Sequence, residues 1–375
     1  MRIVSYIHPI RTYLPCTGAG RFMNNSLLGL AHHDQVKLEL LFASQWLQAD
    51  GYLPANCPLR TLAKRSFPMP ENATERTWKL FSRPKMDSYI PSNTDWLFAP
   101  METYIPVTKC PVAITIFDIQ AFEPDLPWSR SWRHRLFRLK WGQWVRRAFK
   151  DYQLIFTISH FSKQRMVELL GADPNKIEVV GVGVEPAYFD AAAINPAQLS
   201  RPVDLPYTLV IGGLRQKKGA EYVLAVAEAL QKQNSQLQIV VAGSSEANYV
   251  EAAKAYPNLT LLGLVKDEDL PRILRGASSL FFPSHYEGFG IPAVEAMATG
   301  VPAVVSSRGS LPEIVGDAGI VVEPTKIAEV TDILINLESD TALRATYTQR
   351  GLAHAQQYTW PRIVTRLTTA LEQYA

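Results

Sequence analysis

The feature that most constrains the fold is an alternation, in both halves of the chain, of short apolar, β-branched runs with stretches of helical periodicity. This alternation favours α/β layers built on parallel sheets, because helices must cover both faces of such sheets. The predicted strands of the first half are residues 2–6, 36–42, 96–99, 112–117 and 154–158. Those of the second half are residues 207–211, 238–242, 259–262, 279–282 and 303–306.

The two sets of predicted strands meet in residues 186–206, a stretch of weak periodicity that contains Pro196, Pro202 and Pro206. We interpret this stretch as an inter-domain linker. A chain of 375 residues is long enough for two domains that each bury a core. We therefore predict two Rossmann-like, doubly wound domains, 1–188 and 189–357, facing each other across a cleft. Ligands of such sheets bind at the carboxyl ends of the strands.

Composition narrows the classes of function. A net charge of +3 is too small to indicate nucleic-acid binding, so no nucleic-acid partner is predicted. The cysteines Cys16, Cys57 and Cys110 have neither metal-ligand spacing nor a disulfide pattern, which favours a reducing compartment. We find no secretory signal at the amino end and no apolar run near the roughly 18 residues that span a bilayer. These observations predict a cytoplasmic protein.

Two carboxylates, Glu287 and Glu295, lie eight positions apart around a Gly-Phe-Gly turn. The first follows an apolar strand-like run, and the second lies about one turn into a helix whose start is marked by Pro292. Backbone N–H groups at glycine turns and helix starts bind anions. The arrangement suits a nucleotide sugar, with the diphosphate on the amides and sugar hydroxyls on the acids. The amides belong to Gly288, Phe289 and Gly290. A glutamate placed near a helix start for dipole reasons alone is the equal alternative.

Residues 287–307, EGFGIPAVEAMATGVPAVVSS, and residues 310–319, SLPEIVGDAG, resemble the signature of family-4 retaining glycosyltransferases of the GT-B fold. The resemblance is strong from about residue 157 onward and is nearest to the mannosyltransferase-like branch. It implies transfer of a hexose, with mannose as the first expectation, from a nucleotide-diphosphate sugar to a saccharide or lipid-linked acceptor hydroxyl. The anomeric configuration would be kept.

The resemblance also assigns the two domains. Residues 1–188 would bind the acceptor, residues 189–357 would bind the nucleotide sugar, and the helix at 358–375 would pack back on the first domain. Glu287 would contact the sugar ring hydroxyls and Glu295 the ribose hydroxyls. No cofactor or metal is expected, because fixed positive groups would stabilise the leaving diphosphate.

A second motif, Gly-Gly-Leu-Arg-Gln-Lys-Lys-Gly at residues 212–219, directly follows a predicted strand. A strand, a glycine turn and basic residues that open a helix are typical of a phosphate site, although a solvated basic turn gives the same pattern. Lys218 matches the family's lysine, whereas Gly213 stands where the family usually has an arginine. Arg215 or Lys217 must then supply any second charge.

Two candidate sites lie in the first half. Gly20, in the sequence Gly-Ala-Gly-Arg, resembles the family's glycine loop after the first strand, although a simple turn is equally compatible. Asp118 follows a buried-looking strand and could contact the acceptor hydroxyl as a catalytic group, or cap a turn. Phe117 replaces the histidine that the family commonly has before this aspartate. Phe117 and Gly213 leave open a catalytically impaired nucleotide-sugar-binding partner subunit, and a GT-B epimerase or phosphorylase is a further alternative.

Several polar residues are expected to be structural. Ser310 has the spacing of a capping box, Ser159 should cap a helix, and His160 should be exposed. His8 and His285 are more simply explained as structural histidines.

Residues 127–150 are basic and aromatic and contain no acid. A helix of this kind can lie on an anionic membrane surface, which predicts peripheral contact with the inner face of the membrane. The alternative, slightly favoured, places the aromatic side chains in the core and the cations in water. The cations are Arg130, Arg133, Arg135, Arg138, Lys140, Arg146, Arg147 and Lys150, and the aromatic residues are Trp128, Trp132, Phe137, Trp141, Trp144 and Phe149.

Overall fold

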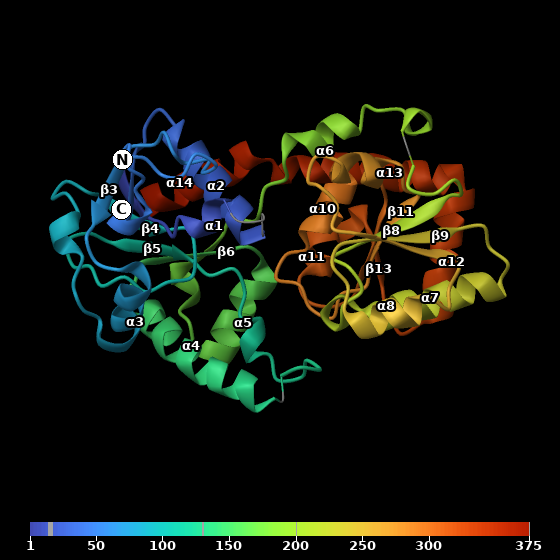
Figure 1. Ribbon diagram of the computed structural model, residues 1–375, viewed down its shortest axis with the longest axis horizontal. Helices are drawn as coiled ribbons and strands as arrows, with labels where there is room; N and C mark the ends of the chain where they lie inside the picture. The colour runs from blue at the N-terminus through green and yellow to red at the C-terminus, as the bar shows by residue number, and fades with distance from the viewer. Residues whose placement is uncertain (14–17, 130, 200, 375) are drawn as a thin grey trace. The chain divides into compact units, whose positions relative to one another are not determined.

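A computed structural model describes residues 1–13, 18–129, 131–199 and 201–374. Cys16 and Arg130 lie outside the described residues. The chain forms two compact units (Figure 1). Unit 1 comprises Met1–Gly183 and Trp360–Ala375, and unit 2 comprises Val184–Thr359. The units divide at 183/184 and 359/360, whereas the sequence placed the boundaries at 188/189 and 357/358.

Unit 1 contains a seven-stranded parallel sheet in the order β3-β2-β1-β4-β5-β6-β7. Its strands are β1 (Arg2–Tyr6), β2 (Lys37–Ala43), β3 (Lys64–Phe67), β4 (Trp96–Ala99), β5 (Val112–Thr115), β6 (Leu154–Thr157) and β7 (Ile177–Val179). Its helices are α1 (Ile10–Tyr13), α2 (Gly18–Ala31), α3 (Glu71–Phe81), α4 (Trp132–Asp151), α5 (His160–Leu170) and α14 (Trp360–Gln373).

Unit 2 contains a six-stranded parallel sheet in the order β10-β9-β8-β11-β12-β13. Its strands are β8 (Tyr207–Ile211), β9 (Gln238–Ala242), β10 (Leu259–Gly263), β11 (Ser279–Phe282), β12 (Ala303–Ser306) and β13 (Ile320–Val322). Its helices are α6 (Pro186–Ala191), α7 (Ala220–Lys232), α8 (Ala247–Ala253), α9 (Leu270–Arg275), α10 (Ile291–Ala298), α11 (Leu311–Val315), α12 (Ile327–Ser339) and α13 (Thr341–Ala355).

The alternation of strands and helices predicted from the sequence is confirmed in both units. Every predicted strand is present within two residues of its predicted ends. Three strands were missed: β3 carries charged residues, and β7 and β13 have only three residues each. The predicted linker was wrong, because residues 186–206 lie within unit 2 and begin with α6, in whose first turn Pro186 lies.

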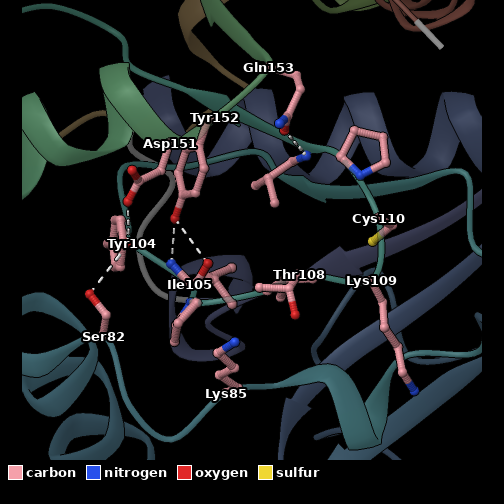
Figure 2. A pocket seen from close by; sticks show the side chains of 14 residues that line it. Ser82, Lys85, Tyr104, Ile105, Thr108, Lys109, Cys110, Asp151, Tyr152 and Gln153 are labelled. Atoms are coloured by element: carbon pink, nitrogen blue, oxygen red, sulfur yellow. Dashed lines mark hydrogen bonds between the residues drawn. The ribbon is translucent and has the colours of Figure 1, made fainter.

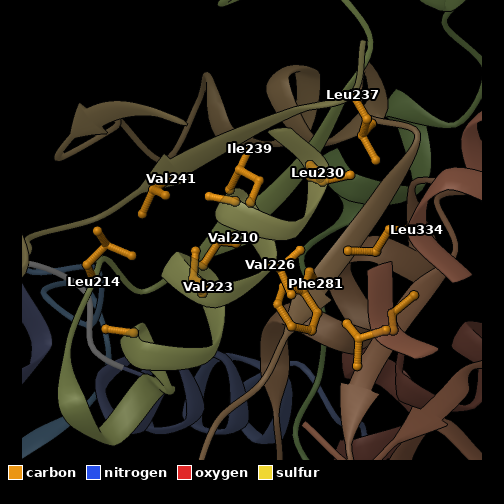
Figure 3. Close-up of a cluster of buried hydrophobic side chains, with 14 of the residues drawn as sticks. Val210, Leu214, Val223, Val226, Leu230, Leu237, Ile239, Val241, Phe281 and Leu334 are labelled. Atoms are coloured by element: carbon orange, nitrogen blue, oxygen red, sulfur yellow. The ribbon is translucent and has the colours of Figure 1, made fainter. Parts of the chain in front are cut away.

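The core of unit 2 forms where helices cover its sheet (Figure 3). One face of α7 buries Val223, Val226 and Leu230, whose i, i+3 and i+7 spacing places them on one side of the helix. They pack with strand residues such as Val210 and Phe281. The central strands β11 and β12 are buried along their whole length, as parallel strands covered on both faces must be.

The C-terminal helix α14 completes unit 1 and lies beside α2 (Figure 1). A Cβ on Gly29 of α2 would come within 2.3 Å of Val364 Cγ2, so glycine permits this close approach. Trp96 Nε1 donates a buried hydrogen bond of 2.9 Å to the Leu371 carbonyl oxygen. The last segment of the chain is therefore an integral part of the first sheet's covering layer.

In each sheet, the numbering of neighbouring strands first falls and then rises. This switch lies between β1 and β4 in unit 1 and between β8 and β11 in unit 2. In open parallel sheets, the loops that leave the carboxyl ends of these two strands diverge and open a crevice between them. The strand order thus marks one candidate binding edge in each unit.

Candidate functional site

The switch point of unit 2 brings together the two motifs that the sequence singled out. The loop after β8 contains Gly212 and Gly213, both at positive φ, and both N–H groups donate to the Ala242 carbonyl oxygen at 2.8 and 2.9 Å. A Cβ on Gly213 would lie 2.1 Å from the Ser244 carbonyl oxygen. Only glycine fits there, which explains physically why this position lacks a side chain.

Lys218 and Glu287 form an ion pair between these two loops, with 2.5 Å between Nζ and Oε1. Their side chains are 22% and 14% exposed. The lysine stem passes Gly212, where a Cβ would lie 3.2 Å from Cε, and its Nζ lies 5.0 Å from the centre of the Phe282 ring. The sequence-predicted cation and acid are therefore adjacent, at the carboxyl ends of β8 and β11.

The turn from Glu287 to Phe289 is fixed by the segment that follows β12. Ser310 Oγ donates to the carbonyl oxygens of Glu287 and Phe289 at 3.0 and 2.9 Å. A Cβ on Gly309 would lie 2.7 Å from the Glu287 carbonyl oxygen, so this neighbour must be small. α11 begins after Ser310 as predicted, but the capping role was wrong, because the hydroxyl makes no cap hydrogen bond and binds this turn instead.

α10 begins at Ile291, with Gly290 before it at a φ of +100° and Pro292 in its first turn. Phe289 is 3% exposed and its ring packs against Tyr358 with centroids 5.4 Å apart, so its side chain is part of the core. Gly288 is buried as well. Glu295 is 2% exposed on α10. The glycine-turn amides and the second acid thus lie on one short strand–turn–helix segment.

The other predicted cations lie on the short helix Gln216–Lys218 or beside it, and both are exposed. Arg215 Nε donates to the Ser244 carbonyl oxygen at 2.8 Å. The carbonyl oxygen of Lys217 accepts a hydrogen bond from the His285 N–H at 3.0 Å, so the backbone of Lys217 contacts the loop that follows β11. Of the three cations, Lys218 is the one that pairs with Glu287.

A cluster around His285 was missed by the sequence analysis, apart from the expectation that His285 is structural. Its Nδ1 accepts from Arg308 at 2.6 Å, which leaves Nε2 to donate to Glu221. Arg308 also donates to Tyr222 OH at 3.1 Å and pairs with Glu323 at 3.3 Å. Burial would raise the pKa of Glu221, but its hydrogen bond with His285 and the nearby charges lower it overall. Only the strand-end position of Arg308, two residues after β12, could have indicated this cluster.

In unit 1, Asp118 lies three residues after β5, as expected, and accepts from the Gln120 N–H at 2.9 Å. Phe117 packs edge-on against the buried Phe22 of α2, with centroids 5.4 Å apart. The predicted glycine loop at Gly20 was wrong, because residues 18–21 lie in the first turns of α2. Asp118 and Gly20 belong to the unit that does not contain Lys218 and Glu287.

Unit 1 holds buried protonatable groups that the sequence did not single out. Glu102 follows β4, and burial, reinforced by the charge of Asp118, raises its pKa to about 8. Glu71 is fully buried, and its Oε2 accepts from Trp46 at 2.8 Å and lies 3.0 Å from His8 Nε2. Burial raises the pKa of Glu71 to about 7 and lowers that of His8. Each group lies within four residues of the carboxyl end of a strand.

A separate pocket of about 560 Å³ opens on unit 1 (Figure 2). It is lined by residues that precede β5 and β6, among them Lys109, Cys110 and Tyr152, so it lies at the amino edge of the sheet. Tyr104 OH donates to Asp151 at 2.6 Å on its wall. Burial raises the pKa of the Cys110 thiol to about 11, so the thiol stays neutral. None of the sequence-predicted site residues lines this pocket.

Neither a metal-binding cluster nor a membrane-spanning helix is present in the described part of the chain. In residues 1–13, 18–129, 131–199 and 201–374, no group of three His, Cys, Asp or Glu side chains is arranged to hold a metal ion. Over the same ranges, no helix combines the length and apolar character needed to cross a bilayer.

Part of the chain is similar to known proteins. Residues 192–354 match the model of glycosyl transferases group 1. The chain is similar to O-antigen chain mannosyltransferase B of Escherichia coli, with 29% identity over 58% of this chain and 60% of that protein. It is also similar to the MMP alpha-(1->4)-mannosyltransferase of Mycolicibacterium hassiacum, with 28% identity over 67% of this chain and 62% of that protein. These matches cover less than two thirds of the relatives' own lengths.

The fold is similar over the whole chain to that of a solved structure. The crystal structure of Anabaena HepE in complex with UDP-glucose matches with a TM-score of 0.68, 16% identity and 100% coverage of each chain. At that identity the likeness concerns the fold, which is GT-B.

Proposed function

We propose that the protein is a retaining glycosyltransferase, because residues 192–354 match the model of glycosyl transferases group 1. It transfers a hexose, mannose first, from a nucleotide-diphosphate sugar to a hydroxyl of a saccharide or lipid-linked acceptor. The similar mannosyltransferases support the choice of hexose, and the UDP-glucose complex of Anabaena HepE supports a nucleotide-sugar donor. The observation that carries the proposal is the Lys218–Glu287 pair beside the glycine loops of unit 2.

In this mechanism the bond between the anomeric carbon and the diphosphate oxygen breaks, and the diphosphate leaves with the electron pair. Lys218 and the amides of Gly288 to Gly290 stabilise the negative charge that develops on it. The acceptor oxygen bonds the anomeric carbon on the same face and passes its proton to the leaving diphosphate. Glu287 orients the sugar through its hydroxyls, and Glu295 binds the ribose.

The groups in unit 1 serve the acceptor in this proposal. Asp118 is an acid at the carboxyl end of β5, where it can accept a hydrogen bond from an acceptor hydroxyl. Phe117 offers an apolar ring edge in place of a polar side chain. No metal or cofactor takes part, since fixed positive groups occupy its electrostatic role.

The first experiment is a thermal-shift series with UDP, GDP, ADP and dTDP and their sugars, without added metal and with EDTA. A ligand at 100 times its dissociation constant stabilises the folded state by about 2.7 kcal/mol. We expect a shift with one nucleotide that Lys218→Ala and Glu295→Ala remove and Lys232→Ala, an exposed lysine on α7, retains. The absence of a shift with every ligand would refute the donor site.

A donor-binding subunit without transfer activity is the second candidate, favoured by Phe117 packing against Phe22 where a polar contact would be expected. Incubation with the identified donor and saccharide or lipid-linked acceptors separates the cases. Transfer yields a glycosylated acceptor whose anomeric configuration is read by NMR. An epimerase would change the donor sugar without an acceptor, a phosphorylase would require inorganic phosphate, and an inactive subunit would give none of these products.

A further inference from the structure

The first half of α4 exposes large apolar side chains to solvent. Trp132, Leu136, Phe137 and Leu139 are 66%, 47%, 55% and 66% exposed. By contrast, Trp144 and Phe149 in the second half are 5% and 7% exposed and belong to the core. The expectation that the aromatic side chains of this segment face the core therefore holds only for its second half. A group of exposed apolar side chains within two turns of one helix indicates a binding surface.

The apolar side chains form a stripe with cations on both sides. Trp132, Leu136 and Leu139 occupy positions i, i+4 and i+7, which lie on one side of a helix. Helical spacing places Arg133 and Lys140 along one border of the stripe and Arg135 and Arg146 along the other. We call these seven residues the α4 outer face. In Figure 1, α4 runs along the border of its unit.

The cations of the outer face have no acidic partner among the residues that the structure describes. α4 contains no acid before Asp151, and none of its cations takes part in an ion pair within the described part of the chain. Arg147, outside the face, donates to Ser82 Oγ at 2.9 Å and to the Lys79 carbonyl oxygen at 3.3 Å, which ties α4 to the end of α3. That end adds the exposed Leu80 and Phe81. The surface is apolar and carries uncompensated positive charge.

Contacts with neighbouring residues of unit 1 hold α4 in place. Ser131 Oγ caps it by accepting from the His134 N–H at 3.2 Å, and His134 Nε2 contacts the Ala121 carbonyl oxygen at 2.9 Å. The Trp141 ring stacks on Phe122 with centroids 5.1 Å apart. The outer face is thus presented by a formed helix and needs no ordering on binding.

We propose that the α4 outer face docks the protein on an anionic lipid bilayer. The helix lies along the surface, with Trp132, Leu136 and Leu139 at the boundary between headgroups and acyl chains. The bordering cations contact anionic headgroups, which attract basic residues near the surface. A nucleic acid would be contacted by the cations alone and would leave the leucines exposed, whereas a bilayer accommodates both. Docking does not depend on the catalytic proposal, but with it a lipid-linked acceptor is favoured over a free saccharide.

Vesicle flotation tests this proposal with the full chain. Wild-type protein is expected to float with vesicles of phosphatidylcholine and phosphatidylglycerol, and to bind pure phosphatidylcholine vesicles at least tenfold more weakly. The double variant Leu136→Glu/Leu139→Glu and the double variant Arg133→Glu/Lys140→Glu should each lose at least tenfold in partition. The matched controls are Leu205→Glu, at a leucine 41% exposed in unit 2, and Lys254→Glu, at an exposed lysine. Both controls should bind as wild type does.

A fluorescence measurement keeps the result independent of any folding defect. Subtraction of the Trp132→Phe spectrum from the wild-type spectrum isolates the Trp132 emission, which should shift to the blue on addition of anionic vesicles. Failure of the wild type to float, or unchanged binding by the leucine double variant, would overturn the proposal. Binding that a DNA duplex competes away and that the leucine variant retains would also overturn it, in favour of a polyanion site.

The thermal shift with nucleotide, measured in solution on the same variants, is independent of docking. A shift without flotation refutes the membrane surface and leaves the donor site intact. Flotation without a shift refutes the donor site and leaves the membrane surface intact.

Discussion

The carboxyl edges of the two sheets have the same topology but different chemistry. Both units open at a strand-order switch, between β1 and β4 and between β8 and β11. In unit 2 the edge consists of glycine backbone and the ion pair of Lys218 with Glu287. In unit 1 it carries His8, Glu71 and Glu102, whose burial favours the neutral forms. One edge holds fixed charge, whereas at the other the pKa of Glu71 is about 7 and that of Glu102 about 8.

This difference indicates a division of roles. Fixed cations and backbone amides suit a ligand of constant negative charge, such as a diphosphate. A protonated carboxylic acid can donate as well as accept a hydrogen bond, which suits neutral hydroxyl groups. The following predictions test whether the two edges differ in this way.

The largest expected effect is on transfer activity when the fixed charge of unit 2 is removed. Lys218→Met should lower kcat by at least about 100-fold, because removing one group that stabilises developing negative charge typically costs about 10² to 10³ in rate. Lys232→Met, at an exposed lysine of α7 paired with Glu228, is the control and should keep its rate. A Lys218→Met enzyme of normal kcat would show that another group stabilises the leaving diphosphate.

The glycine backbone of the same edge predicts a stability effect. Gly213→Ala should destabilise unit 2 by about 3 kcal/mol, because positive φ costs a residue with a side chain 1–2 kcal/mol and the Cβ meets the Ser244 carbonyl oxygen. Gly263→Ala has a similar φ and open space around its Cβ, so about 1 kcal/mol is expected. Urea unfolding monitored by hydrogen exchange of the α7 amides measures both. Equal effects would mean that the loop relaxes away from Ser244.

Unit 1 offers a matching stability test where α14 covers its sheet. Trp96→Phe should cost about 2 kcal/mol, because the buried Leu371 carbonyl oxygen loses its donor and a cavity replaces the indole. Trp132→Phe, at a tryptophan 66% exposed, should be neutral. Limited proteolysis at the C-terminal segment measures the release of α14. Unchanged protection in Trp96→Phe would mean that α14 is held by its other contacts.

The edge of unit 2 could be predicted from the sequence because each of its two motifs is a contiguous run of residues that directly follows a strand. Glycines and prolines fix unusual backbone angles locally, so Gly290 and Pro292 mark the turn and the helix start wherever they occur. Lys218 and Glu287 follow two strands that were both predicted, and parallel strands bring their carboxyl ends to one edge. The role of Ser310 was missed, because a hydroxyl can cap a helix or bind a distant carbonyl and spacing does not distinguish these.

The edge of unit 1 could not be predicted in the same way. Its groups come from separate segments, and a lone His8 or Glu71 is ambiguous without its neighbours. The strand before Glu71, with the sequence KRSF, is too charged to be read as a strand. Gly18 to Arg21 lie in the first turns of α2, but glycines are typical of turns, so these residues were read as a loop. For α4 the prediction holds only in part. Both halves of the helix have the same basic and aromatic pattern, but only the second half is buried against the rest of unit 1.

The smallest expected effect is a pH dependence of the folding stability of unit 1, which arises from protonation of Glu102. A carboxylic acid whose pKa is raised in the folded state, here to about 8, binds its proton more tightly when folded, so it stabilises the fold at low pH. This contribution is complete below the unfolded pKa near 4.5 and is lost as the pH rises to 8. Because the Glu102 side chain is partly exposed, solvent screens part of this effect. We therefore expect unit 1 to lose about 1 kcal/mol of folding stability from this group. The full pKa shift, at 1.36 kcal/mol per pKa unit, would give a larger loss.

Glu102→Gln should remove that slope, since glutamine stays neutral throughout. Urea unfolding of unit 1 at pH 5, 6.5 and 8 measures it, with Glu268→Gln, at an exposed residue of unit 2, as the control. Glu71 titrates in the same direction with its pKa near 7, whereas His8 has a lowered pKa and acts in the opposite direction. The informative quantity is therefore the difference between wild type and Glu102→Gln at each pH. A difference that does not change with pH would show that Glu102 is ionised in the folded protein, and the edges of the two units would then both carry fixed charge.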